Sequence, residues 1–221
     1  MAAILKNTVA PRLPNATESY DEQAANQFTN ILRLYFNTID AFNTALVSEN
    51  GGKELSFPHI AASDTTDQYA TASNTPTVVA WNVLESNSGF VLTPPGSATC
   101  NESGVYKITY SAQLANTANT VHDAAFWLRI NGVDVARSTT IFTLPARKSS
   151  GAPTYLCGYS EVVFSINGGD VIQLVWATDQ AYSTTGPVNG VYIFADPAQT
   201  SPYARPAVPS VIGSITFLSR L

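Results

Sequence analysis

The sequence predicts a mainly β protein, in which an extended arm and one long α-helix precede an antiparallel β-sandwich. Two observations predict this architecture. A heptad repeat of apolar residues runs through residues 19–48, and short apolar or alternating segments separated by turn residues follow from residue 54 onward. A chain of 221 residues is long enough for one sizeable β domain and an appendage. We therefore expect an arm at 1–18, a helix at 19–50 and a β domain at 51–221.

The first eighteen residues show no apolar period and contain Pro11 and Pro14. Proline fixes φ and removes a backbone donor, so this stretch is predicted to be extended. Its apolar residues have no core of their own, and the arm is therefore either disordered or laid across a partner, which we favour. The residues expected to contact that partner are Leu5, Val9, Arg12 and Leu13.

The helix is predicted from seven apolar residues at alternating spacings of three and four. This rhythm is typical of a seam that packs against other helices. The seam residues are Ala25, Phe28, Leu32, Tyr35, Ile39, Phe42 and Leu46.

Both ends of the helix have capping signals. Ser19 with Glu22 matches a capping box, and Asn50 followed by Gly51-Gly52 suits a left-handed C-cap. The seam allows two interpretations. Either the helix packs on the β domain of its own chain, or three copies form a bundle. Aromatic residues would crowd a two-stranded seam, which favours a trimer.

Ten segments in the β domain have the period-two or short apolar pattern of strands. They are 55–61, 77–83, 89–92, 104–114, 124–130, 133–138, 159–166, 171–176, 190–194 and 210–218. Two of the intervening sequences predict β-hairpins, namely Asn131-Gly132 and the run from Asn167 to Asp170.

The composition excludes several classes of protein. Charged residues make up 12%, about half the usual ~25%, so Ser, Thr, Asn and Gln must cover much of the surface. A net charge of −5 without a basic cluster argues against nucleic-acid binding. No apolar run approaches the ~20 residues of a membrane span, and the N-terminus does not match a signal peptide. We expect Cys100 and Cys157 to be small buried residues, with a mutual disulfide as the alternative.

The segments 90–94 and 100–111 are the informative stretch. They contain a strand with the pattern Gly-hydrophobic-Tyr-x-hydrophobic, and this strand follows a segment bounded by Pro and Gly residues. This pair resembles the trimeric jelly rolls of the complement and tumour-necrosis-factor type. The segments 125–132 and 169–174 resemble the next hairpin and a later Gly-Asp strand of that fold. The resemblance implies an antiparallel jelly roll that associates as a compact homotrimer.

A second resemblance concerns the two ends of the chain. The segments 13–16, 32–40 and 208–216 are similar to structural proteins of tailed bacteriophages, including cyanobacterial phages. The resemblance implies a protein of the virion surface that is synthesised in the host cytoplasm. The collagen-like stalk of the complement proteins is absent, and the heptad helix stands in its place.

The sequence predicts no enzyme, no cofactor and no metal site. His59 and His122 are not spaced as metal ligands, and His122 and Asp123 are expected to point to opposite faces of a strand. The run from Asp64 to Asp67 comes nearest to a calcium site, but we interpret it as a solvated loop. Neither a nucleophile elbow nor a phosphate-binding loop is present.

Aromatic residues could serve packing or binding. Trp81, Trp127 and Trp176 lie in strand segments, which predicts core positions rather than a sugar-stacking platform. The loops 116–120, 147–153 and 182–189 are the expected places for a ligand. The candidate ligand-binding residues are Tyr155, Tyr159 and Tyr182.

Two functional hypotheses follow, and a third, a soluble ligand-binding module of a cell, is disfavoured by the predicted helix and by the resemblance. The first is a homotrimeric capsid decoration or cement protein that binds the major capsid protein or other virion proteins through its arm and helix. The second is a receptor-binding fibre or spike protein that recognises a host surface glycan. Stacked exposed aromatic residues on the distal face would favour the second.

Overall fold

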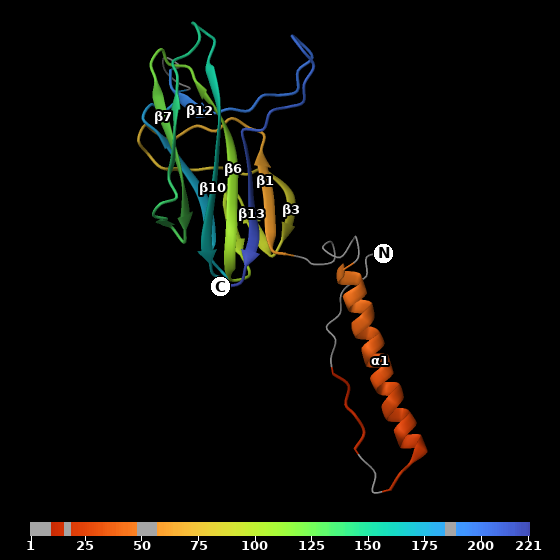
Figure 1. The fold of residues 1–221 in the computed structure, drawn as a ribbon. Helices are drawn as coiled ribbons and strands as arrows, with labels where there is room; N and C mark the ends of the chain where they lie inside the picture. Colours follow the sequence, from red (N-terminus) through yellow and green to blue (C-terminus); the bar gives the residue numbers. More distant parts are fainter. Residues whose placement is uncertain (1–9, 16–18, 48–56, 184–188) are drawn as a thin grey trace. The chain divides into compact units, whose positions relative to one another are not determined.

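The computed structural model describes residues 10–15, 19–47, 57–183 and 189–221. The chain divides into two compact units, Met1–Ser56 and Phe57–Leu221, and each is described by itself (Figure 1). The first unit contains the helix α1, and the second contains all the strands. Among the described residues, no helix is long and apolar enough to span a membrane.

The helix α1 spans Glu22–Val47 and begins one residue after its cap, Asp21. Asp21 Oδ1 accepts the backbone N–H of Gln23 at 2.8 Å and that of Ala24 at 3.4 Å. The predicted capping box from Ser19 to Glu22 is therefore wrong, because the carboxylate of Asp21 satisfies the first free donors of the helix. The predicted C-cap at Asn50 and Gly51-Gly52 lies outside the described residues.

The apolar seam lies along one side of α1. Phe28 leaves 40% of its surface exposed, and the other six seam residues are half-buried. Two apolar residues off the seam, Leu34 and Phe36, are each 56% exposed. The role of this stripe in a trimer remains a prediction.

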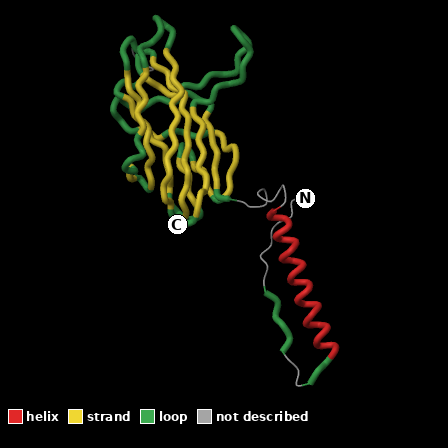
Figure 2. Tube along the Cα trace, viewed as in Figure 1, coloured by secondary structure: helices red, strands yellow, loops and turns green. Residues whose placement is uncertain are grey.

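The second unit is a sandwich of two antiparallel sheets (Figure 2). The six-stranded sheet has the order β10 (Thr154–Ile166), β6 (Gly104–Asn116), β13 (Val211–Ser219), β1 (His59–Asp64) and β3 (Val83–Ser88), with β12 (Val191–Ile193) also paired to β6. The seven-stranded sheet has the order β4 (Phe90–Thr93), β5 (Ser97–Cys100), β11 (Val171–Thr178), β7 (His122–Ile130) and β8 (Val133–Asp134), with β2 (Thr77–Val78) on β11 and β9 (Thr140–Leu144) on β7.

The strand order is that of a jelly roll. After β5 the chain crosses between the sheets several times. The strands β6 and β10 lie in the six-stranded sheet, β7 to β9 and β11 lie in the seven-stranded sheet, and β12 and β13 lie in the six-stranded sheet again. The first and last strands, β1 and β13, pair with each other at the centre of the six-stranded sheet. Two antiparallel sheets joined by such crossings form a jelly-roll sandwich, which confirms the predicted fold class.

An aromatic stack joins the two sheets in the core. Phe126 of β7 lies 5.7 Å from Tyr110 of β6 and 5.9 Å from Trp176 of β11, measured between ring centroids. Trp176 is fully buried, as predicted, whereas Trp81 and Trp127 are only half-buried. Buried aromatic pairs contribute about 0.5–1.5 kcal/mol each beyond their burial.

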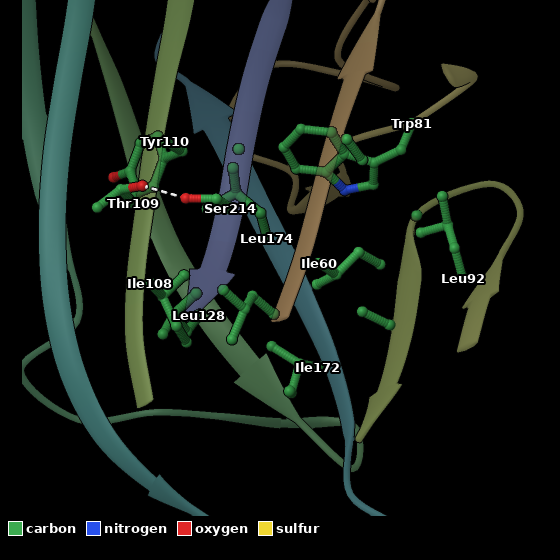
Figure 3. Close-up of a pocket in the computed structure, with 15 residues that line it drawn as sticks. Ile60, Trp81, Leu92, Ile108, Thr109, Tyr110, Leu128, Ile172, Leu174 and Ser214 are labelled. Carbon is green, nitrogen blue, oxygen red and sulfur yellow. Dashed lines mark hydrogen bonds between the residues drawn. The ribbon is translucent and has the colours of Figure 1, made fainter. Parts of the chain in front are cut away.

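Figure 3 shows a small cavity between the sheets, lined by apolar side chains that include Ile60, Trp81, Ile108 and Leu128. Its volume is about 50 Å³. Ligand pockets have volumes of roughly 300 Å³ or more, so this cavity is a packing gap rather than a binding site.

Three strands were not predicted from the sequence pattern, namely β3, β5 and β9. The predicted strand 77–83 is interrupted, because the backbone N–H of Trp81 bonds to Pro95 O instead of a ladder partner. The predicted strand 133–138 keeps only its first two residues as β8. Pairing with neighbouring strands decides whether such short segments form strands, and the local sequence pattern does not reveal that pairing.

The two predicted hairpins have different outcomes. Asn131 and Gly132 have φ values of 51° and 78° and connect Ile130 to Val133, which confirms the two-residue turn. The turn from Asn167 to Asp170 does not form a hairpin, because it leads from β10 in one sheet to β11 in the other. Asn, Gly and Asp favour any tight turn, whether the next strand pairs with the preceding one or joins the other sheet.

The two cysteines are free and differ in exposure. Cys100 is buried, as predicted, but Cys157 is exposed. Cys157 pairs with Gln113 in the register of β10 and β6, at a position that points away from the core. The expectation that both are buried is therefore wrong for Cys157.

Candidate functional site

The side of the six-stranded sheet that faces away from the core presents three rows of side chains. Along β6 the even-numbered residues from Tyr106 to Leu114 are buried, so the odd-numbered residues form this outer face. The rows, read from β1 through β13 and β6 to β10, are His59–Thr216–Lys107–Val163, Ala61–Ser214–Thr109–Glu161 and Ser63–Ile212–Ser111–Tyr159.

This outer face carries few charged side chains. Lys107 Nζ and Glu161 Oε2 lie 3.7 Å apart and pair with each other. Small hydroxyl side chains fill the centre, where Thr109 and Ser214 are joined by a hydrogen bond of 2.8 Å (Figure 3). Apolar residues flank them, with Ile212 49% exposed and Val163 51% exposed.

Five aromatic residues gather beside β12, at one end of the same face. They form what we call the tyrosine cluster, which consists of Tyr69, Tyr155, Tyr182, Tyr192 and Phe194. Tyr155 on β10 and Tyr192 on β12 both pair with Ala115 of β6, and they cover its small side chain.

The rings of the tyrosine cluster touch one another. The centroid of Tyr69 lies 5.3 Å from that of Tyr182 and 5.6 Å from that of Tyr192, and both pairs are stacked. Tyr155 packs on Phe194 at 4.7 Å. These separations are typical of favourable aromatic pairs, so the rings hold one another in place.

Backbone hydrogen bonds fix the segments that carry these rings. Gln68 exchanges both of its backbone hydrogen bonds with Ile193 of β12, at 2.8 and 3.0 Å. Tyr182 donates its backbone N–H to Val191 O, and Phe194 donates its N–H to Gln113 O at 2.7 Å. The cluster therefore rests on ordered backbone contributed by four parts of the chain.

Asp67 is the carboxylate of the tyrosine cluster. Its Oδ2 accepts the hydroxyl of Tyr69 at 3.1 Å, and its Oδ1 accepts the backbone N–H of Ala195 at 2.8 Å. Burial and the charge of Asp67 raise the pKa of Tyr69 to about 12. Burial likewise raises the pKa of Tyr155 and that of Tyr192, with a further contribution from nearby carboxylates. The hydroxyls of these three tyrosines therefore stay protonated at neutral pH.

The structure brings together two of the three candidate tyrosines. Tyr155 and Tyr182 belong to the cluster, whereas Tyr159 lies two rows of residues further along the outer face and donates its hydroxyl to Glu161 at 3.2 Å. Sequence reasoning missed Tyr69, which follows a segment interpreted as a loop. The interpretation of that loop as solvated is wrong for Asp64, which is buried and accepts hydrogen bonds from Thr66.

The structure describes two of the four candidate residues of the arm. Arg12 and Leu13 are exposed, and Leu13 leaves 41% of its surface accessible. Leu5 and Val9 lie outside the described residues. A role for these four residues in partner binding stays a prediction.

The histidines have hydrogen-bond partners. His122 Nδ1 lies 3.1 Å from Asp179 Oδ2, and His122 Nε2 lies 2.8 Å from the hydroxyl of Thr120. Asp179 Oδ1 also accepts the backbone N–H of Asp123, so this chain ties the start of β7 to the end of β11. Both ring nitrogens of His59 are likewise engaged, with Phe57 O and Ser86 Oγ. Across the described ranges, no three His, Cys, Asp or Glu residues are grouped as metal ligands would be.

No protein-family model matches this sequence. No curated protein matches it either. Among solved structures, the chain is similar to the tumour necrosis factor Eiger of S. frugiperda, with 10% identity, a TM-score of 0.46, and 75% of this chain and 95% of that chain covered. It is also similar to the globular domain of the zebrafish complement 1qA protein, with 11% identity, a TM-score of 0.41, and 75% and 100% covered.

The first testable prediction concerns the alkaline titration of Tyr69. Because its pKa is about 12 in the folded protein and near 10 in the unfolded chain, the protonated hydroxyl stabilises the fold below pH 10. This contribution is lost as the pH rises from 10 to 12. Titration of phenolate absorbance should show that Tyr69→Phe removes a group ionising near pH 12. Removal of a group ionising near pH 10 would contradict the role of burial and Asp67.

Proposed function

We propose that the protein is a homotrimeric structural protein on the outer surface of a tailed-phage virion, where it decorates and stabilises the head. The observation that supports self-assembly most directly is the outer face of the six-stranded sheet. Its two longest strands, β6 and β10, present small hydroxyl groups and exposed apolar side chains with one pair of opposite charges. Interface cores are depleted in charge in the same way.

A second copy of the chain is the occupant that suits this face. Lys107 and Glu161 could exchange partners between copies, because each copy offers both charges on the same surface. Small residues such as Ser111 and Ser214 allow flat backbone surfaces to approach closely. Tyr159, which is 59% exposed, and Ile212 would supply the apolar contacts.

The helix would add a second association element. The seven seam residues, which are half-buried to exposed in one copy, would be covered by the same residues of two other copies. Three copies of one helix match the threefold symmetry proposed for the sandwich.

The arm would connect the trimer to the virion. Leu13 and Arg12 are exposed in an extended segment bounded by prolines, and such a segment can follow the surface of a capsid subunit. Each arm would be ordered only on docking, so a single arm would bind weakly. Three arms on one trimer would multiply that weak affinity, with the major capsid protein or another virion protein as the partner.

The tyrosine cluster favours the second candidate function, a receptor-binding fibre or spike protein that recognises a host surface glycan. Stacked and partly exposed aromatic residues at one end of the sandwich are the feature expected of a receptor-binding tip. In that case the arm and helix would attach the protein to the virion, and the sandwich would bind the host.

The role of the outer face in self-association can be tested with a matched pair of charge substitutions. Ile212→Glu places a carboxylate on the outer face of the six-stranded sheet, and Ile141→Glu places one on the seven-stranded sheet, where Ile141 is 64% exposed. We expect Ile212→Glu to convert the trimer to monomers in light scattering, because three buried carboxylates would repel one another. The Ile141→Glu trimer should persist. The reverse outcome would assign self-association to the other sheet.

The location on the virion can be tested by co-sedimentation with phage heads produced without this protein. We expect the full chain to pellet with the heads. A variant with Arg12→Glu and Leu13→Asp should remain in the supernatant, because both exposed contacts of every arm are lost.

The control is Tyr20→Ala, which removes a side chain that is 85% exposed just beyond the arm. It should pellet like the unmodified chain. Failure of the unmodified chain to bind heads, together with binding to host cells, would replace the decoration role with the second candidate.

A further inference from the structure

The tyrosine cluster leaves part of its aromatic surface open to solvent. Tyr155 is 47% exposed and Tyr69 is 39% exposed, although each packs on another ring of the cluster. Phe194, Tyr182 and Tyr192 lie beneath or beside them and are more buried. The rings of Tyr155 and Tyr69 are thus partly exposed to solvent, and the other three rings of the cluster support them.

Polar groups surround this open aromatic surface. Asp67 holds the hydroxyl of Tyr69, and a carboxylate oxygen has acceptor capacity beyond that single bond. Lys148 Nζ lies 5.9 Å from the ring centroid of Tyr155 and can donate hydrogen bonds. The phenol groups can both donate and accept. The site therefore combines flat apolar surface with directional polar groups of both kinds.

We propose that the tyrosine cluster binds a neutral saccharide. A pyranose ring has an apolar face of C–H groups, which can stack on a tyrosine, and a rim of hydroxyls, which both donate and accept hydrogen bonds. The carboxylate of Asp67 and the ammonium of Lys148 have opposite charges, so the site does not select a charged sugar. This inference rests on the second candidate function and specifies the residues that bind the glycan and the absence of charge on it, and it does not depend on the trimer.

An alternative ligand, a quaternary ammonium ion, fits the same residues less well. Such cations bind inside cages whose aromatic walls stand apart and surround the charge. Here Tyr69, Tyr182 and Tyr192 are in mutual contact at 4.8–5.6 Å, which leaves no space between them. In addition, Lys148 already places a cation beside Tyr155.

The rings are also held in place before any ligand binds. Backbone hydrogen bonds from Gln68, Tyr182 and Phe194 attach the surrounding segments to β12 and β6. A saccharide would therefore bind to rings whose own backbone segments are already fixed, which lowers the entropic cost of binding on a shallow surface.

The position of the cluster in the sandwich suits a receptor site. The chain enters the sandwich at Phe57, and His59 lies in the row that contains Lys107 of β6. The cluster lies in the row of Ala115, eight residues further along β6, or roughly 25 Å away. Figure 1 shows β12 at the end of the sandwich opposite the C-terminus. Within the sandwich, the cluster is thus remote from the first strand, β1.

The experiment is a binding screen of the full chain against neutral tetrasaccharides of glucose, galactose, mannose and N-acetylglucosamine. We expect at least one of these probes to bind in isothermal titration calorimetry. Tyr155→Ala and Tyr69→Ala should each weaken binding at least tenfold, because each removes a stacking surface. Tyr203→Ala serves as the matched control, since Tyr203 is 66% exposed and lies outside the cluster. It should bind as the unmodified chain does.

Two further variants separate stacking from folding. Tyr69→Phe keeps the ring and removes the hydroxyl, and Asp67→Asn keeps the shape of the side chain and removes the charge. Both should weaken binding less than Tyr69→Ala does, with an unchanged circular dichroism spectrum. Absence of binding by all four tetrasaccharides would overturn the proposal. Equal binding by Tyr155→Ala and the unmodified chain would also overturn it.

The solution mass of the variants distinguishes this proposal from self-association. If Tyr155→Ala and Tyr69→Ala change the oligomeric state and no saccharide binds, the cluster is part of an interface between copies and the saccharide site is refuted. If the mass is unchanged and binding is lost, the saccharide proposal stands, whatever the result for the outer face and the arm.

Discussion

The alternation of side chains along β6 is the constraint on which the rest of the sandwich depends. This strand pairs with β10 on one side and with β13 and β12 on the other, so it lies within the six-stranded sheet over its whole length. Its even-numbered residues, such as Tyr106 and Leu114, are buried against the second sheet. Its odd-numbered residues form the middle of the outer face. A shift of one residue would exchange the two sets, and it would bury Lys107.

The same strand connects the two proposed functional surfaces. Thr109 and Ser111 lie at the centre of the face assigned to self-association, and Ala115 lies beneath the tyrosine cluster. The two surfaces differ in chemistry. The first is flat and rich in small hydroxyl groups, which suits another copy of the same surface, while the second combines exposed aromatic rings with Asp67 and Lys148. Self-association and ligand binding can therefore occupy neighbouring parts of one sheet.

The sequence predicted the features that depend on local physics. The period-two pattern located β6, β7, β11 and β13, and Asn131-Gly132 specified its turn because both residues tolerate positive φ. The heptad spacing predicted α1, although Asp21 caps it in place of Ser19. The jelly-roll order could not be derived from periodicity, because a pattern of strands does not say which sheet the next strand joins. The turn at Asn167 shows this, since it connects two sheets rather than two paired strands.

The candidate site was predictable only in part, for a similar reason. Tyr155 and Tyr182 were selected because tyrosines in loops suit wet contacts, and they do meet in the cluster. Tyr69 was missed because its place depends on the pairing of Gln68 with Ile193, which is remote in sequence. Asp123 was expected to point away from His122, and the carboxylate that the ring contacts is that of Asp179, at the end of β11. Contacts of this kind follow from the fold and leave no local signal.

The decisive measurement is the solution mass of the full chain by multi-angle light scattering. The proposed trimer should give a single species of three times the chain mass of 23.6 kDa. A species of 23.6 kDa that persists at every concentration would contradict it, because the seam of α1 and the outer face of the six-stranded sheet would then have no partner copy.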